Sequence, residues 1–165
     1  MHWKPDLESP RGEKPAELLV NMMKARGFTL IELLVTIAVM AIMATIAVPG
    51  FQNMMASNRL AGDYNEVLSG LNYARSEAIK RRENVTFQID DGSGTWVYEV
   101  KAGGIDLVIR QGRDSRVVVS DVTVVFNSLG RRESCSSTAC EISVSNSSGS
   151  REMQVSTTGR IGKSP

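Results

Sequence analysis

Glu32 is the residue best placed to do chemistry, because it is the single charged residue in an apolar run from Phe28 to Val48. An acid inside a membrane-spanning helix raises the free energy of insertion by roughly 2.5–3.5 kcal/mol, so it usually has a partner. A cut between Gly27 and Phe28 would create an α-amino group four residues before Glu32, on the same helix face and with a pKa of about 8. We expect this amine to pair with Glu32 of its own chain or of a neighbouring helix. Pairing between chains would make assembly in the membrane self-selecting.

The apolar run is long enough to cross a bilayer. Its roughly 21 residues form a helix of about 32 Å at ~1.5 Å per residue, against a hydrocarbon core of about 30 Å. Lys24 and Arg26 precede the run, and the positive-inside rule places that end of the chain in the cytoplasm. The chain after Val48 is then expected outside.

The segment from Gly27 to Leu33 resembles the N-terminal signal of type IV pilins and type II secretion pseudopilins. The resemblance implies that a prepilin peptidase cuts after Gly27 and methylates the new terminal residue, Phe28, and that Glu32 is the assembly carboxylate. It also implies a helix kink at Pro49. A plain membrane anchor is the alternative. A secretory signal peptide fits less well, because its apolar core is only about 7–15 residues long and ends in an A-x-A-like site.

The length, charge and composition of the chain exclude several classes of function. The chain has 165 residues, which suffice for an anchor and one domain, and its net charge of +1 argues neither for nor against nucleic acid. Its single histidine, His2, lies in the segment that the proposed cut removes. The mature protein would then have no imidazole for acid–base catalysis or metal ligation. We expect no cofactor and no enzymatic activity.

Residues 1–27 are expected to be the leader, and residues 28–82 a helix whose part 28–48 spans the membrane. A start at Met23 would give a short leader of the kind found in this family, with the first 22 residues as an extension. At Pro49-Gly50 the chain either bends within the helix or ends it in a loop, because proline removes one helical hydrogen bond.

Residues 51–82 have an apolar stripe at helical spacing, so one face should pack on a soluble domain. The stripe comprises Leu60, Tyr64, Val67, Leu68, Leu71, Ala74, Ala78 and Ile79. The opposite, polar face comprises Asn58, Arg59, Asp63, Asn65, Glu66, Asn72 and Glu77. Lys80, Arg81 and Arg82 end the helix, where cations favour its dipole. The segment 71–81 resembles the GspH/FimT branch of the family.

From residue 84 the pattern is that of short strands. Residues 85–89 and 96–100 read as a hairpin around the turn cluster 90–94, and further strands are expected at 105–110, 117–120, 122–127, 142–145 and 153–156. The valine-rich runs 117–119 and 122–126 suggest burial on both faces. Residues 143–150 have loop composition. In each of two segments, 125–131 and 154–160, a strand is followed by Ser or Thr, then glycine and arginine. Glycine at that point suits a turn with positive φ.

Cys135 and Cys140 are read as a disulfide, because a cysteine pair in an exported domain is usually oxidised. The closed loop is short, so the chain-entropy model gives roughly 2 kcal/mol of stabilisation. A metal or redox pair is less favoured, because the pair lacks C-x-x-C spacing and further ligands.

The C-terminal Gly159-Arg160 matches the first half of the Gly-Arg-x-Arg motif through which pilins resembling the FimT branch bind DNA. Gly162 stands where the second arginine would be, and Lys163 could supply that charge, although without arginine's bidentate fork. The candidate DNA-binding residues are Arg160, Lys163, Arg131, Arg132 and Arg151. The alternative is an ordinary solvated terminus.

The sequence therefore predicts an α+β, pilin-like protein, with a transmembrane-then-amphipathic N-terminal helix packed on an antiparallel β-rich head at 84–165. Its expected function is that of a minor pilin in or priming a type IV pilus; the alternatives are a GspH-type pseudopilin of type II secretion and a pilus-tip DNA receptor. Expected partners are other pilin or pseudopilin subunits, the prepilin peptidase and the inner membrane, with DNA left open. The chain should sit in the bacterial inner membrane with its head in the periplasm, and later in the filament.

Overall fold

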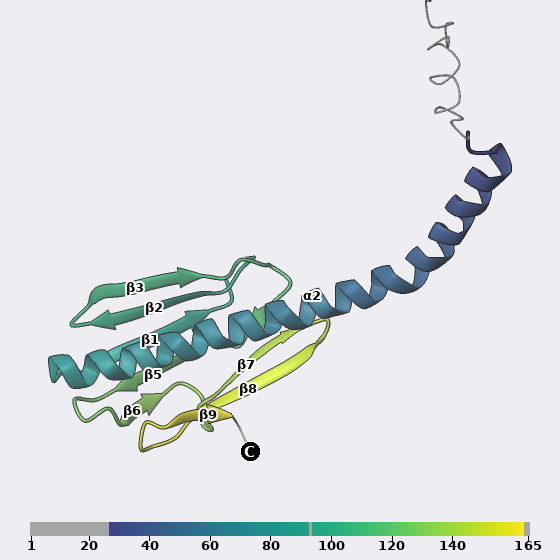
Figure 1. Cartoon of the computed structure of the whole chain (residues 1–165). Coiled ribbons are helices and arrows are strands. Elements are labelled where there is room, and N and C mark those ends of the chain that lie inside the picture. The colour runs from purple at the N-terminus through teal and green to yellow at the C-terminus, as the bar shows by residue number, and fades with distance from the viewer. Residues whose placement is uncertain (1–26, 93, 164–165) are drawn as a thin grey trace, which may run out of the picture. The chain divides into compact units, whose positions relative to one another are not determined.

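The computed structural model describes residues 27–92 and 94–163, and the leader prediction lies largely outside these residues. The chain divides into two compact units, residues 1–44 and 45–165. One helix, α2 (Leu30–Arg81), contributes to both (Figure 1). It ends at Arg81, because the next residue, Arg82, has a left-handed φ of 59° that cannot continue a helix.

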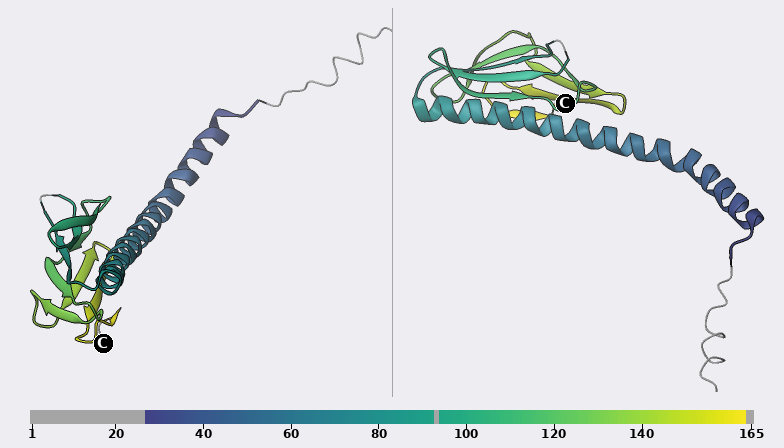
Figure 2. Two further views of the ribbon diagram at one scale, coloured as in Figure 1. Left: turned by 90° about the vertical axis from the view of Figure 1, so that its left-hand side faces the viewer. Right: turned by 90° about the horizontal axis from the view of Figure 1, so that it is seen from above.

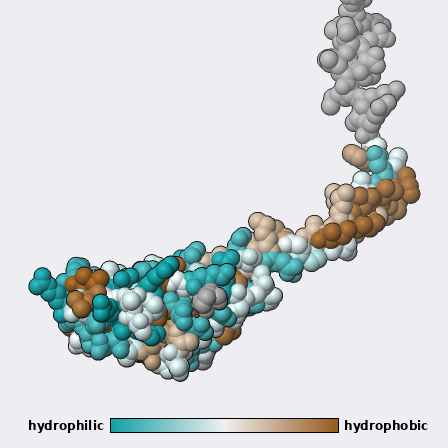
Figure 3. Space-filling view, turned by 90° about the horizontal axis from the view of Figure 1, so that it is seen from below, coloured by the Kyte–Doolittle hydropathy of each residue, from teal (hydrophilic) through white to brown (hydrophobic). Residues whose placement is uncertain are grey.

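The first part of α2 has the properties of a membrane anchor. Among the described residues, α2 is the one helix long and apolar enough to cross a membrane. Residues 27–54 are all exposed, and Figure 3 shows apolar side chains gathered along this part of the chain. The predicted helix 28–82 is confirmed to within two residues. The alternative of a loop at Pro49 is wrong, because the helix continues through it.

The later part of α2 buries one face against the head, as predicted. Leu60, Val67, Leu71, Ala74 and Ala78 are buried, and Tyr64 and Leu68 are partly buried. Two positions of the predicted pattern are wrong.

Ile79, expected in the apolar stripe, is 49% exposed, whereas Glu77, expected on the polar face, is only 6% exposed. Glu77 tolerates burial because Lys80 Nζ and Arg81 Nε donate to its carboxylate at 3.0 and 2.7 Å. Both hydrogen bonds lower the pKa of Glu77, and the one from Arg81 has the larger effect.

The head consists of two antiparallel sheets, and Figure 2 shows both on one side of the later part of α2. The five-stranded sheet has the order β3-β2-β1-β5-β6, and the four-stranded sheet the order β4-β7-β8-β9. The strands of the first sheet are β1 (Val85–Asp90), β2 (Val97–Ala102), β3 (Ile105–Gln111), β5 (Val122–Phe126) and β6 (Arg132–Cys135). Those of the second are β4 (Val118–Val119), β7 (Glu141–Asn146), β8 (Gly149–Val155) and β9 (Ile161–Lys163).

The predicted hairpin is confirmed, with Phe87 of β1 opposite Val100 of β2. The sequence pattern missed β6 and β9, which are short and polar. Residues 143–150 are not a loop, since β7 and β8 pair from Glu141↔Gln154 to Asn146↔Gly149. The prediction that residues 117–119 are buried on both faces of the sheet is wrong, because Val118 is 51% exposed. Strand β5 instead alternates buried and half-buried residues.

An aromatic ladder forms the core beneath α2. The rings of Phe87 and Tyr98 lie 5.2 Å apart, and those of Trp96 and Tyr98 stack at 6.0 Å. Gly70 of α2 faces this ladder, and a Cβ at Gly70 would lie 2.7 Å from the Tyr98 ring. The glycine therefore allows helix and sheet to approach closely.

The two glycines of the later part of α2 should respond to alanine in opposite directions. A Cβ at Gly62 would have no atom within 4 Å, so Gly62→Ala should stabilise the protein by up to about 1 kcal/mol through helix propensity. Gly70→Ala gains the same propensity but overpacks the Tyr98 ring, for a net loss of about 1–2 kcal/mol. Denaturant unfolding of the full chain in detergent measures both, and equal effects of the two substitutions would contradict the close packing at Gly70.

Candidate functional site

The N-terminal site consists of the Gly27–Phe28 peptide bond and the first turn of α2. Residues 27–29 precede the helix, so this bond lies in backbone without helical hydrogen bonding, and Phe28 is 81% exposed. Glu32 is exposed in an otherwise apolar segment. Within the described part of the chain, its carboxylate has no hydrogen-bond or ion-pair partner.

Thr29 is a residue of this site that the sequence analysis missed. Its Oγ1 accepts a hydrogen bond of 3.2 Å from the backbone N–H of Glu32, so Thr29 is the N-cap of α2. Thr29-Leu-Ile-Glu32 is the S/T-x-x-E pattern of a capping box, which is readable from sequence. Glu32 therefore has two separable roles to test: stabilisation of its own helix end, and pairing with a cation.

Two glycine turns lie against each other at the end of the head where α2 ends. In the first turn, Asn127 N–H donates to Arg131 O at 2.9 Å, and in the second, Ser156 N–H donates to Arg160 O at 2.9 Å. Each turn places its glycine at positive φ, 69° for Gly130 and 80° for Gly159. The sequence similarity of segments 125–131 and 154–160 thus reflects one repeated turn geometry.

The stacking of these turns is close and includes α2. A Cβ at Gly159 would collide with the carbonyl oxygen of Gly130, and a Cβ at Gly130 would lie 2.6 Å from Ile79 Cδ1. Arg75 Nε donates to that same Gly130 carbonyl at 3.0 Å. Helix α2 therefore packs against the first turn, and the first turn packs against the second.

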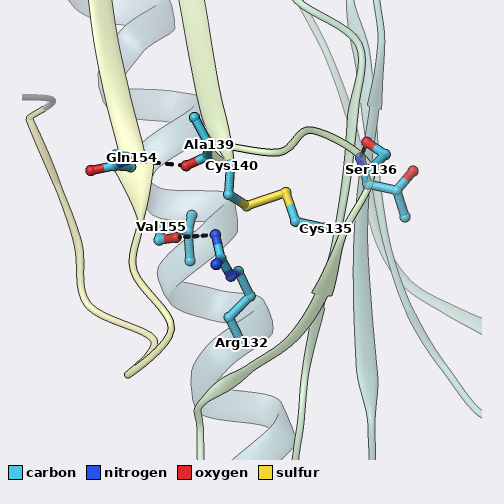
Figure 4. The surroundings of a disulfide bond; sticks show 8 residues. Arg132, Cys135, Ser136, Ala139, Cys140, Gln154 and Val155 are labelled. Carbon is cyan, nitrogen blue, oxygen red and sulfur yellow. Dashed lines mark hydrogen bonds between the residues drawn. A yellow bond between two sulfur atoms is a disulfide. The ribbon is translucent and has the colours of Figure 1, made fainter.

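The structure brings together only two of the five candidate DNA-binding residues. Arg131 and Arg160 directly follow the stacked glycines and are exposed. Arg132, in contrast, donates from Nη1 to Val155 O at 2.8 Å and links the two sheets (Figure 4). Arg151 lies over the Tyr64 ring, 6.0 Å from its centroid, away from the glycine turns.

Lys163 cannot stand in for an arginine at position 162. Residues that are opposite in an antiparallel pair share a face, and successive residues alternate. Lys163 is opposite the buried Met153, whereas Gly162 is opposite Gln154. The Lys163 side chain therefore leaves the strand on the face opposite to that of Gly162 and Arg160. The sequence showed only that Lys163 lies one position after Gly162, and not which face of the sheet it occupies.

The Cys135 and Cys140 sulfurs are joined in a disulfide (Figure 4). Cys135 ends β6 of one sheet, and Cys140 precedes β7 of the other, so the bond closes the crossover between the sheets. The Cys140 carbonyl also accepts from Val155 N–H at 3.0 Å. The bridge thus does more than shape a local loop, because it joins the edge strand β6 of one sheet to the start of β7 in the other.

An open groove of about 1270 Å³ lies between α2 and the β2–β3 hairpin. Asp114 accepts from Arg116 Nη2 at 2.8 Å and lies 3.1 Å from Arg59 Nη1. Hydrogen bonds from Arg116 lower the pKa of Asp114 to about 2, and burial with the nearby Glu66 raises the pKa of Tyr98 to about 12. Neither group titrates near neutral pH, so neither suits general acid–base catalysis. The described residues also hold no cluster of three His, Cys, Asp or Glu that could bind a metal ion.

The apolar helix with an acid in its first turn, joined to an antiparallel head, defines a pilin-like structural subunit. Two family models match the chain: the prokaryotic N-terminal methylation motif over residues 22–48, and type II transport protein GspH over residues 63–159. The chain belongs to this GspH family, whose members are structural subunits and not enzymes.

The curated relatives are named as fimbrial or pilus proteins. A fimbrial protein of Pseudomonas aeruginosa is 31% identical over 124 residues, which cover 64% of this chain and 80% of the relative. The type IV wide pilus major component PilA4 of Thermus thermophilus is 42% identical over 74 residues, covering 45% of this chain and 49% of the relative. The crystal structure of the minor pilin FimU of Pseudomonas aeruginosa matches with a TM-score of 0.53 at 21% identity, covering 68% of this chain and 92% of FimU. This last match shows the shared fold.

Proposed function

We propose that the chain is a minor pilin, a structural subunit that is incorporated into a type IV pilus or primes its assembly. The observation that carries the proposal is the exposed Glu32 carboxylate, which has no partner within the described residues although it lies in an apolar, exposed segment. Such an acid is tolerated in lipid only with a partner, and sister subunits are the source of one.

The proposed mechanism has three steps. The apolar part of α2 holds the subunit in the inner membrane, with its N-terminus in the cytoplasm and its head in the periplasm. A prepilin peptidase then cuts the exposed Gly27–Phe28 bond and methylates Phe28. The new positive terminus meets Glu32 of its own or a neighbouring chain, and the helices join a bundle in which Pro49 provides a kink.

Processing is tested by mass spectrometry of the membrane-extracted protein from cells with an active prepilin peptidase. The expected N-terminal peptide begins at a methylated Phe28. A chain that stays intact across residues 27 and 28 would instead indicate an ordinary membrane-anchored domain.

The alternative is a GspH-type pseudopilin of type II secretion, which the description of the matching family favours. The names of the relatives, a fimbrial protein and a pilus component, favour the pilus. Deletion of the gene separates the two, because a pilin is needed for surface filaments and a pseudopilin for release of exoproteins. An epitope-tagged chain should appear in sheared filaments of the complemented strain. Normal piliation of the deletion strain with blocked secretion would favour the alternative.

DNA binding for uptake is a second candidate function, favoured by the adjacency of Arg131 and Arg160. Two phosphate contacts give a slope of log K against log salt of about −1.8, compared with about −4.5 for five contacts. A gel-shift titration with Arg160→Ala and Lys163→Ala tests it. Binding should weaken in Arg160→Ala and stay unchanged in Lys163→Ala, because Lys163 lies on the other face.

A further inference from the structure

We propose that the surface around the stacked glycine turns is a docking site for the acidic end of a neighbouring pilin-like head. This helix-end surface comprises Arg75, Ile79, Leu129, Arg131 and Arg160. The inference rests on the proposed function, because it identifies the chemistry of a partner within the filament.

The first support is exposed apolar surface held in a fixed position. Leu129 is 72% exposed at the tip of the first turn, although polar residues are usual in turns. Ile79, which contacts Gly130 next to Leu129, is 49% exposed. Two large aliphatic side chains, one on the turn and one on the helix that packs against it, are thus exposed to solvent. The turn is fixed by Asn127 Oδ1, which accepts from the Leu129 and Arg131 N–H groups at 3.0 and 3.1 Å. A surface that needs no reordering loses little entropy on binding.

The second support is local charge. The segments 75–83, 127–133 and 156–160, which meet at this end of the head, carry seven lysines and arginines but three glutamates, whereas the net charge of the whole chain is only +1. Within the described residues, the guanidinium groups of Arg131 and Arg160 have no hydrogen-bond or ion-pair partner. Arginines around an apolar centre are typical of protein interfaces, and they select a partner with carboxylates.

The third support is the opposite end of the same sheet. Register places Phe126, next to the first glycine turn, opposite Val85, and Val122 opposite Ile89 at the other end of β1. At that other end Asp91 N–H donates to Asp121 Oδ1 at 2.7 Å, and Asp90 is adjacent, so three carboxylates gather there. Val118, near them in sequence, is exposed. A pilin-like head can therefore carry a basic–apolar end and an acidic end, which suits head-to-tail contacts; such heterologous contacts build filaments.

A DNA ligand would contact the arginines but not the apolar side chains of Leu129 and Ile79, whereas a protein partner would contact the arginines and the apolar side chains. This difference sets the experiment. A photoreactive amino acid replaces Leu129 in the full chain, in cells whose pilin-like subunits carry distinct tags. Ile109, which is 50% exposed in the middle of the edge strand β3 and lies at neither end of the sheet, is the control position.

We expect the probe at 129 to crosslink to a carboxylate-bearing surface of one pilin-like head at least ten times more than the probe at 109. The double substitution Arg131→Glu, Arg160→Glu should reduce the crosslink at least tenfold, and Arg113→Glu, a reversal on an exposed loop, should not. Changing the crosslinked carboxylates of the partner to lysine should restore it.

A crosslink no stronger than that at 109, one that survives the double reversal, or one to DNA would overturn the proposal. The first measurement keeps both arginines, so it does not depend on the folding of a charge-reversed chain. If Glu32→Ala blocks assembly while position 129 fails to crosslink, the proposed function stands and this inference alone falls.

Discussion

Substitution of Glu32 by alanine is expected to leave cleavage at Gly27 intact and to reduce incorporation into filaments by a factor of about 100 or more. Removing one member of an ion pair in an apolar environment destabilises by about 3–5 kcal/mol, and ~1.4 kcal/mol corresponds to a factor of ten. The substitution would leave the terminal amine of a neighbouring subunit without its partner. The measurement compares the processed protein in the membrane with that in sheared filaments.

The structure supplies the control for this experiment. Glu32 lies in the first turn of α2, where a carboxylate favours the helix dipole, so a defect in Glu32→Ala could arise from a weakened helix end. Thr29→Ala removes the cap but keeps the carboxylate, at a cost of about 0.5–2 kcal/mol of helix stability. We expect Thr29→Ala to assemble nearly normally and Glu32→Gln, which keeps hydrogen bonding but not charge, to fail. Normal filaments from Glu32→Gln, or an equal defect in Thr29→Ala, would refute charge pairing.

Substitution of Gly159 by alanine should have the largest effect on the stability of the head, about 3 kcal/mol or more. The φ of Gly159 is 80°, a region that costs other residues about 1–2 kcal/mol. Overpacking adds about 1–3 kcal/mol, and here the added methyl group meets the backbone carbonyl of Gly130, which cannot rotate away as a side chain can.

Gly162→Ala is the matched control, because it lies three residues further along and has no atom within 4 Å of an added Cβ. Its effect should stay within about 0.5 kcal/mol. Denaturant unfolding of the full chain in detergent, followed by the circular dichroism of the strands, compares the two. Similar midpoints for both variants would show that the two turns are not packed against each other.

These stacked turns also show how far the sequence could lead. The repeated Ser or Thr, glycine and arginine in segments 125–131 and 154–160 correctly indicated two turns, since glycine at positive φ is a local requirement. That the turns touch is a long-range fact. It follows from the pairing of β5 with β6 and of β8 with β9, and from the packing of both sheets on α2. The same packing placed the Arg151 guanidinium over the Tyr64 ring and turned that of Arg132 toward Val155 O, although both carry the same charge as Arg131 and Arg160.

The sequence alone determined the apolar run, the acid within it, the N-terminal methylation motif, the long helix and most of the strands. Those features depend on neighbouring residues: the length of an apolar run, a helical or two-residue period, and a motif read from contiguous positions. Only the tertiary structure decided that Glu77 is buried, that Lys163 faces away from Arg160, and that Leu129 and Ile79 share an exposed surface with two arginines. These outcomes depend on which segments lie side by side after folding, and burial and charge at one position are set there by residues distant in the chain.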